Sequence, residues 1–177
     1  MAGLVAAYGD FFGTTTYGGA NCYTSEACGT VFTLTAGTLS TLHSFARDGS
    51  VPKSKRDGRY PVGRLTLGED GALYGTTENG GSFHQGSCGF LESCGTIFKM
   101  TGGGLDWTET VVYRFCDQAR YSYFCTTGAY PTAGLFAYQG ALYGTTSYQG
   151  EGATCNCGMV FKLDYGESLR KGRKPKL

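Results

Sequence analysis

Two histidines are the side chains of this sequence best suited to general acid–base chemistry. His84 lies in the glycine-rich segment "GGSFHQGSCG" and could act as a general base or a metal ligand, with the carboxylate of Glu78 as a second catalytic candidate. His43 lies in "LSTLHSF", and the similar segment "ETVVYRF" has Tyr113 at the same position. Because that position accepts either ring, we expect His43 to pack rather than to react.

Glu78 and Asn79 are the candidate metal ligands. They follow "GALYGTT", and carboxylate and amide oxygens are ligands that Ca²⁺ prefers. The matching positions in two similar segments hold Thr-Tyr (16–17) and Ser-Tyr (147–148). Such asymmetry is typical of a single functional site, but also of sequence drift in a loop, which is the simpler interpretation. Calcium is the one cofactor that the sequence indicates.

An aromatic segment at 116–131 is the candidate ligand-binding surface. Its candidate contact residues are Arg120, Tyr121, Tyr123 and Phe124. Aromatic rings beside an arginine suit contact with carbohydrate or protein. The same rings could instead cover the edge of a sheet, and the sequence leaves both interpretations open.

Eight cysteines fall into four local pairs. The pairs are Cys22 and Cys28, Cys88 and Cys94, Cys116 and Cys125, and Cys155 and Cys157. A zinc site is disfavoured because no CxxC pair or His-x-x-x-His arrangement is present. Disulfides fit the even count, although the last pair, with one residue between its members, could be a free dithiol or a labile bridge. Disulfides indicate an extracellular or periplasmic location.

Composition and motifs exclude several classes of function. The sequence contains no Gly-x-Ser-x-Gly nucleophile elbow, no phosphate-binding loop and no EF-hand pattern. The formal net charge of +1 gives no reason to expect nucleic acid as a partner, and no apolar stretch predicts a membrane span. The start, "MAGLVAAYGDFF", does not have the pattern of a signal peptide.

A repeat positions all of these residues. "GALYGTT" occurs at 71–77 and 140–146, and a divergent copy, "GDFFGTT", at 9–15. Each copy is followed by a second shared segment: "CGTVFTL", "CGTIFKM" and "CGMVFKL". "LSTLHSF" and "ETVVYRF" then complete the first two copies. Such self-similarity is the strongest architectural signal in the sequence.

Each repeat predicts four short strands. Turn residues such as "EDG", "YQG" and "TGGG" separate short runs of alternating polarity, which is typical of all-β structure. In "GTIFKM", for example, Phe98 and Met100 share one face and Lys99 the other. Four strands with recurring glycine and aromatic residues are the pattern of a β-propeller blade.

The sequence resembles the GloVer repeat family, whose hallmark is similar to "GxLYGTT…GG…GTVFxL…LHxF". The resemblance covers about residues 2–165. It implies a secreted bacterial, propeller-like repeat protein, and it implies no catalytic residues.

We therefore predict one repeat domain at 1–165, with units at about 2–60, 61–130 and 131–165, and a basic disordered tail at 166–177. The last unit lacks its fourth strand, and propellers need four to eight blades. A homodimer completing the ring is the favoured interpretation, and a fragment of a longer propeller is the alternative.

The predicted function is an extracellular propeller-type binding or scaffold module of unknown ligand, with a small molecule or carbohydrate as a candidate. The alternative is a calcium-dependent hydrolase, of lactonase or esterase type, with its site at the centre of an oligomeric propeller. That alternative rests on analogy of fold.

Overall fold

The computed structural model describes residues 3–20, 28–46, 57–81, 93–116, 127–148 and 157–164, and these form strands and turns without a helix. The strands are β1 (Val5–Ala7), β2 (Asp10–Thr15), β3 (Thr30–Thr35), β4 (Thr38–Ser44), β5 (Gly58–Pro61), β6 (Thr66–Leu67), β7 (Leu73–Gly80), β8 (Thr96–Gly103), β9 (Asp106–Arg114), β10 (Phe136–Tyr138), β11 (Ala141–Thr146) and β12 (Met159–Asp164). The predicted all-β class is confirmed. No helix in the described stretches is long and apolar enough to cross a membrane.

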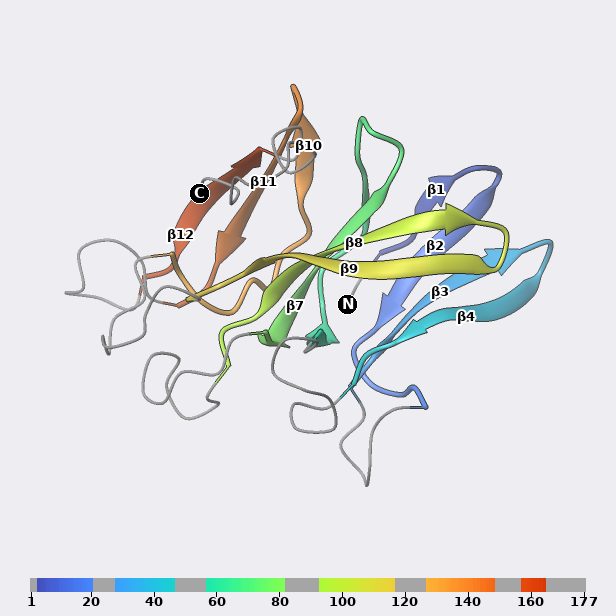
Figure 1. The fold of residues 1–177 in the computed structure, drawn as a ribbon, viewed down its shortest axis with the longest axis horizontal. Coiled ribbons are helices and arrows are strands. Elements are labelled where there is room, and N and C mark those ends of the chain that lie inside the picture. The colour runs from blue at the N-terminus through green and yellow to red at the C-terminus, as the bar shows by residue number, and fades with distance from the viewer. Residues whose placement is uncertain are drawn as a thin grey trace.

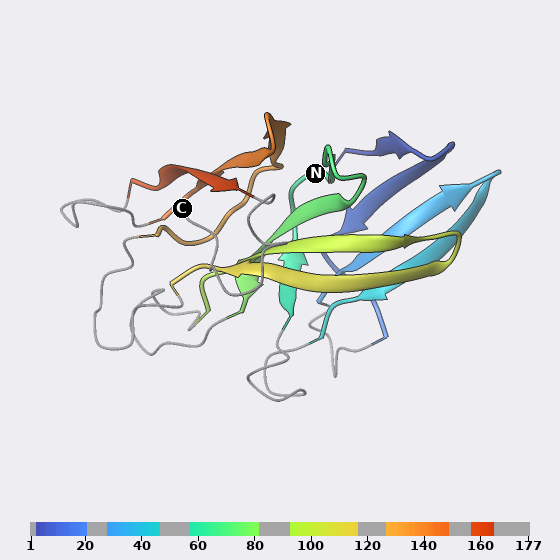
Figure 2. The same cartoon turned by 45° about the horizontal axis from the view of Figure 1, so that its top comes forward.

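The strands form three antiparallel sheets, one for each repeat (Figure 1). The first sheet has the order β1-β2-β3-β4, and the third has the order β10-β11-β12. The second sheet has the order β5-β7-β8-β9, with β6 also paired to β7. The second sheet lies between the other two, as both views show (Figures 1 and 2).

Strand β5 departs from the predicted division into units. The predicted boundary between residues 60 and 61 falls inside β5, and β5 pairs with the far end of β7, with Gly58 opposite Gly80. The last residues of the predicted first unit therefore belong to the second sheet. This pairing also places residue 57 beside the gap between the first two sheets.

The core consists of two apolar layers, each between neighbouring sheets. In the first layer, Val31 of β3 and Phe45, just after β4, pack with Phe98 and Met100 of β8. In the second layer, the equivalent residues of the next pair of sheets pack together, including Phe115, Leu142 and Phe161. Both faces of the second sheet are therefore buried.

The contact between sheets is the same in both layers. The Phe45 and Phe98 rings lie 5.1 Å apart at 68°, and the Phe115 and Phe161 rings lie 5.2 Å apart at 65°. Both are edge-to-face pairs, a favourable arrangement of aromatic rings. The recurring "SF" or "RF" and "VF" or "IF" dipeptides of the repeat thus supply the contact that joins one sheet to the next.

The glycine of each "GTT" motif is required by close packing within its sheet. A Cβ atom built on Gly75 would fall on the ring of Phe98, which lies opposite it on β8, and 2.9 Å from Leu65. Gly13 and Gly144 meet Phe32 and Phe161 in the same way. The predicted role of this glycine as a point where only a small residue fits is consistent with this geometry.

Candidate functional site

Three ionisable side chains meet between the first and second sheets: His43, Asp57 and Glu109. They are the one group of three potential metal-ligating residues found in the described part of the chain, and their ligand atoms all lie within 4.8 Å of one another. His43 is on β4, Asp57 directly precedes β5, and Glu109 is on β9. The site is therefore built by both repeats.

Register explains why these side chains face one another. A bulge between Val31 and Phe32 places His43 opposite Val31, whose side chain is buried against the second sheet. Glu109 lies opposite Met100, which is buried in the same apolar layer. Residues directly opposite in an antiparallel pair point to the same face, so His43 and Glu109 approach the gap from its two sides.

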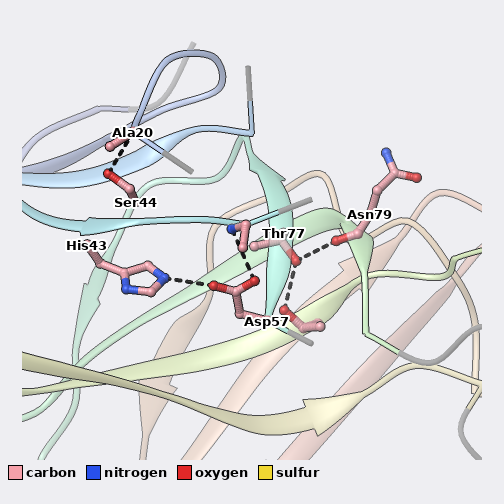
Figure 3. Close-up of polar contacts among 8 residues, drawn as sticks. Ala20, His43, Ser44, Asp57, Thr77 and Asn79 are labelled. Atoms are coloured by element: carbon pink, nitrogen blue, oxygen red, sulfur yellow. Dashed lines mark hydrogen bonds and ion pairs between the residues drawn. The ribbon is translucent and has the colours of Figure 1, made fainter. Parts of the chain in front are cut away.

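His43 and Asp57 form a hydrogen-bonded pair (Figure 3). The His43 Nε2 atom lies 2.9 Å from Asp57 Oδ2, and the two side chains are 23% and 12% exposed. The other carboxylate oxygen, Oδ1, accepts a hydrogen bond from the backbone N–H of Ala46 at 3.2 Å. The His43 ring also meets Phe45 edge-on at 4.8 Å. The pair is thus held by backbone and aromatic contacts on both sides.

The carboxyl group of Glu109 has a raised pKa. Burial raises the pKa of its carboxyl group from 4.5 to about 7; His43 and Arg114 act to lower the pKa, and the charge of Asp57 acts to raise it. Its Oε1 atom is buried and has no hydrogen-bond partner in the described structure. A buried oxygen without a partner is costly, so this atom is well suited to receive a ligand.

The next pair of sheets shows which of these contacts packing requires. Tyr113 takes the position of His43 and packs edge-on against Phe115 at 5.2 Å. Thr127 takes the position of Asp57, and its Oγ1 accepts a hydrogen bond from the backbone N–H of Cys116 at 3.0 Å. Uncharged residues therefore make both the ring contact and the backbone hydrogen bond at this second gap. The interpretation of His43 as a packing residue explains its ring contact but not its bond to Asp57.

Sequence reasoning missed Asp57 and Glu109. Aligning "DGRYP" with "TGAYP" pairs Asp57 with Thr127 and would have marked a charge in place of a hydroxyl. Aligning "ETVVYRF" with "LSTLHSF" pairs Glu109 with Leu39. That alignment would have drawn attention to a carboxylate at a position where the other repeat has an apolar residue. What no alignment indicated is that the two positions face the same gap.

The predicted metal ligands lie elsewhere. Glu78 and Asn79 are inside β7 rather than after a strand, and Glu78 is half-buried. Asn79 is buried, its backbone carbonyl accepts a hydrogen bond from Thr77 Oγ1 at 2.8 Å, and its Oδ1 has no hydrogen-bond partner in the described structure (Figure 3). The structure does not bring Glu78 and Asn79 into the three-residue group above.

The other predicted residues fall partly or wholly outside the description. His84, Arg120, Tyr121, Tyr123 and Phe124 all lie outside the described residues. The described cysteines are Cys28, Cys94, Cys116 and Cys157, and each is disulfide-bonded. The other four cysteines lie outside the described residues, so the predicted pairing of each bridge stays a prediction.

Stacked antiparallel sheets that repeat one side-chain contact define an all-β tandem-repeat protein. The chain belongs to the Gloeobacter/Verrucomicrobia repeat family, whose model matches residues 1–171. The resemblance found in the sequence is thereby confirmed. No curated protein and no solved structure matches the chain.

Proposed function

We propose that this chain is a propeller-type binding or scaffold module that closes a ring with a second copy of itself, outside the cytosol. The observation that carries the proposal is the pair of apolar faces left uncovered on the first and third sheets. Each of these faces corresponds to one that is buried between sheets elsewhere in the same chain. The ligand of the module is unidentified.

The uncovered face of the first sheet corresponds to the face that the second sheet buries. In the second sheet, Leu65 and Leu73 are fully buried against the first sheet. Their counterparts in the first repeat, Leu4 and Phe11, are 47% and 49% exposed. The first sheet thus presents the surface by which a repeat docks onto the repeat before it.

The uncovered face of the third sheet corresponds to the face by which a repeat packs against the repeat that follows it. Val31 and Ile97 are fully buried against the following sheet in the first and second repeats. Their counterpart in the third repeat, Val160 of β12, is 72% exposed, and Phe136 of β10, at the opposite edge of that sheet, is 66% exposed. Exposed apolar clusters of this kind are typical of interaction surfaces.

The two uncovered faces are complementary in the way that the chain's own sheets are. The third sheet of one copy could therefore dock through Val160 onto the face of another copy that carries Leu4 and Phe11, as Val31 and Ile97 pack against the following sheet within each copy. The described third sheet has three strands, so this docking does not include the phenylalanine contact that follows the fourth strand of the other repeats. Two copies joined in this way would form six blades, within the range that closes a propeller. Such head-to-tail contacts close into a ring when the rotation between units permits it.

The disulfide-bonded cysteines support the proposed location. Disulfides persist in oxidising compartments and are rare in the cytosol. A count of free thiols in the purified, denatured chain tests this point. We expect no reactive thiol before reduction, whereas several reactive thiols would contradict an oxidising location.

The experiment that tests assembly is the mass of the chain in solution by light scattering, with two matched variants. Val160→Asp places a charge on the uncovered face of the third sheet. Leu105→Asp places the same charge on a residue that is 70% exposed at the turn between β8 and β9. We expect a mass of two chains for the wild type and Leu105→Asp, and of one chain for Val160→Asp.

A folded wild-type monomer at high protein concentration would contradict the shared ring, and the uncovered faces would then belong to contacts with other repeats or proteins. Equal masses for the two variants would also contradict it. The alternative function, a calcium-dependent hydrolase, stays a prediction, because no observation in the described residues favours it.

A further inference from the structure

We propose that His43, Asp57 and Glu109 bind a divalent transition-metal ion of the Zn²⁺ type between the first and second sheets. This inference is independent of the proposed ring, because all three residues lie within one chain. It also differs from the predicted calcium site in its residues and in its chemistry.

The donor atoms determine the class of metal. One imidazole nitrogen and two carboxylate oxygens suit Zn²⁺ and similar divalent ions, whereas Ca²⁺ takes oxygen ligands alone. Zn²⁺ binds such atoms at about 2.0–2.2 Å, so two ligands of a tetrahedral ion lie about 3.3 Å apart. His43 Nε2 and Asp57 Oδ2 are already 2.9 Å apart. Both atoms can therefore reach one ion after only a small shift.

Glu109 completes the set from the opposite sheet. Its ligand oxygen lies within 4.8 Å of the ligand atoms of both other residues. Its Oε1 atom is buried and has no hydrogen-bond partner in the part of the chain that the structure describes. Binding a cation would provide this oxygen with the partner that it lacks.

Packing alone does not account for three ionisable residues at one interface. At the gap between the second and third sheets, His43 and Asp57 have the uncharged counterparts Tyr113 and Thr127. The counterpart of Glu109 in the first sheet is Leu39, which is 65% exposed. Thr127 Oγ1 accepts a hydrogen bond from the backbone N–H of Cys116, just as Asp57 Oδ1 accepts one from the backbone N–H of Ala46. One oxygen is enough for this structural hydrogen bond, so the second oxygen of Asp57, Oδ2, is not needed for it.

The internal counterparts supply the substitutions. His43→Tyr, Asp57→Thr and Glu109→Leu each copy the residue at the equivalent position of another repeat, and a cooperative melting curve checks that each variant folds. Asp57→Thr keeps a hydroxyl for the backbone N–H of Ala46. Asp164→Asn is the control, because it neutralises a carboxylate of the exposed pair with Lys162 on the third sheet.

The test is a calorimetric titration of the tag-free, oxidised chain with Zn²⁺, Co²⁺ and Ca²⁺, together with thermal melts of each variant. We expect one Zn²⁺ or Co²⁺ per chain and much weaker binding of Ca²⁺. Each ligand variant should weaken Zn²⁺ binding more than roughly 100-fold, since loss of an outer-shell partner alone costs 10- to 100-fold. The control should bind as the wild type does.

The visible spectrum of bound Co²⁺ provides a second readout, because it reports nitrogen and oxygen coordination directly. We expect His43→Tyr to abolish that spectrum while its melting curve stays cooperative. Zn²⁺ should raise the melting temperature of the wild type and of the control, but not of the ligand variants. A wild-type chain that binds no Zn²⁺, or ligand variants that bind it like the control, would overturn the proposal.

Discussion

Replacing Gly75 by alanine tests whether close packing explains the central glycine of the repeated motif. A Cβ atom at this position would lie 2.7 Å from Phe98 Cε1 and 2.9 Å from Leu65 Cδ2. Phe98 is fully buried and packs against Phe45, whose ring centre is 5.1 Å away. The Phe98 ring therefore has no free direction in which to retreat.

The expected loss of stability can be compared with that of a second variant. Overpacking a buried site lowers the free energy of unfolding by about 1–3 kcal/mol, and because the Phe98 ring is enclosed we expect Gly75→Ala to lower it by about 2–3 kcal/mol. Gly13 meets Phe32 and Leu4 at similar distances, but both belong to the uncovered face of the first sheet. These side chains can move into solvent, so we expect Gly13→Ala to cost the monomer less than about 1 kcal/mol.

Urea unfolding of both variants at a protein concentration that keeps the chain monomeric measures the difference. A loss of about 2 kcal/mol also lowers the melting temperature by roughly 4–8 °C for a chain of this size. The double variant Gly75→Ala/Phe98→Leu should recover part of the loss, because leucine vacates the space that the new methyl group needs. Equal effects at Gly13 and Gly75, or no recovery in the double variant, would refute the packing explanation.

Three further predictions concern stability. Phe45→Ala should lower the free energy of unfolding by about 3–5 kcal/mol in urea, because it removes a buried ring from the contact between sheets; a loss below 1 kcal/mol would contradict this. Burial acts to raise the pKa of Asp70, but hydrogen bonds from Lys99, Tyr74 and the Ala72 backbone, with the charge of Lys99, lower it below 3.8. Asp70→Asn should therefore destabilise the fold at pH 7, and the difference from wild type should shrink as the pH falls below about 4; a constant difference between pH 7 and pH 3 would argue against the network. Reduction should cost about 2 kcal/mol for each of the two predicted loops of about seven residues, Cys22 to Cys28 and Cys88 to Cys94, which urea unfolding with and without reductant measures.

The repeat made the order of strands predictable. Each "GALYGTT"-like segment forms the strand β2, β7 or β11, and each "GTVFTL"-like segment pairs with it in antiparallel register. The reason is local: alternating polarity, turn residues and a small residue opposite a phenylalanine act within one hairpin. Three copies of the same pattern also made the family recognisable before any contact was known.

The arrangement of β5 was not predictable in the same way. Its four residues carry no alternating pattern, and the predicted boundary between units separated Pro61 from the other three. In the structure they pair with β7, where Arg59 lies opposite Asn79. This pairing depends on how far the chain travels between sheets, which local patterns do not encode.

The candidate site shows the same division. His43 was interpreted as a packing residue. Glu109 was not considered, because nothing in the local pattern of its strand marks it as part of a site. The residues come from positions 14 and 52 apart in the chain, counted from Asp57, and no shared motif links them. Their proximity follows from the contact between β4 and β9, which belong to different repeats.

The sequence by itself determined the strands, their pairing within each repeat and the family, because these depend on interactions between residues close together in the chain. The tertiary structure decided which faces of the sheets meet, which two faces remain uncovered, and that three ionisable side chains share one gap. These features arise where separate repeats stack, and the distances between atoms there depend on the twist and register of whole sheets.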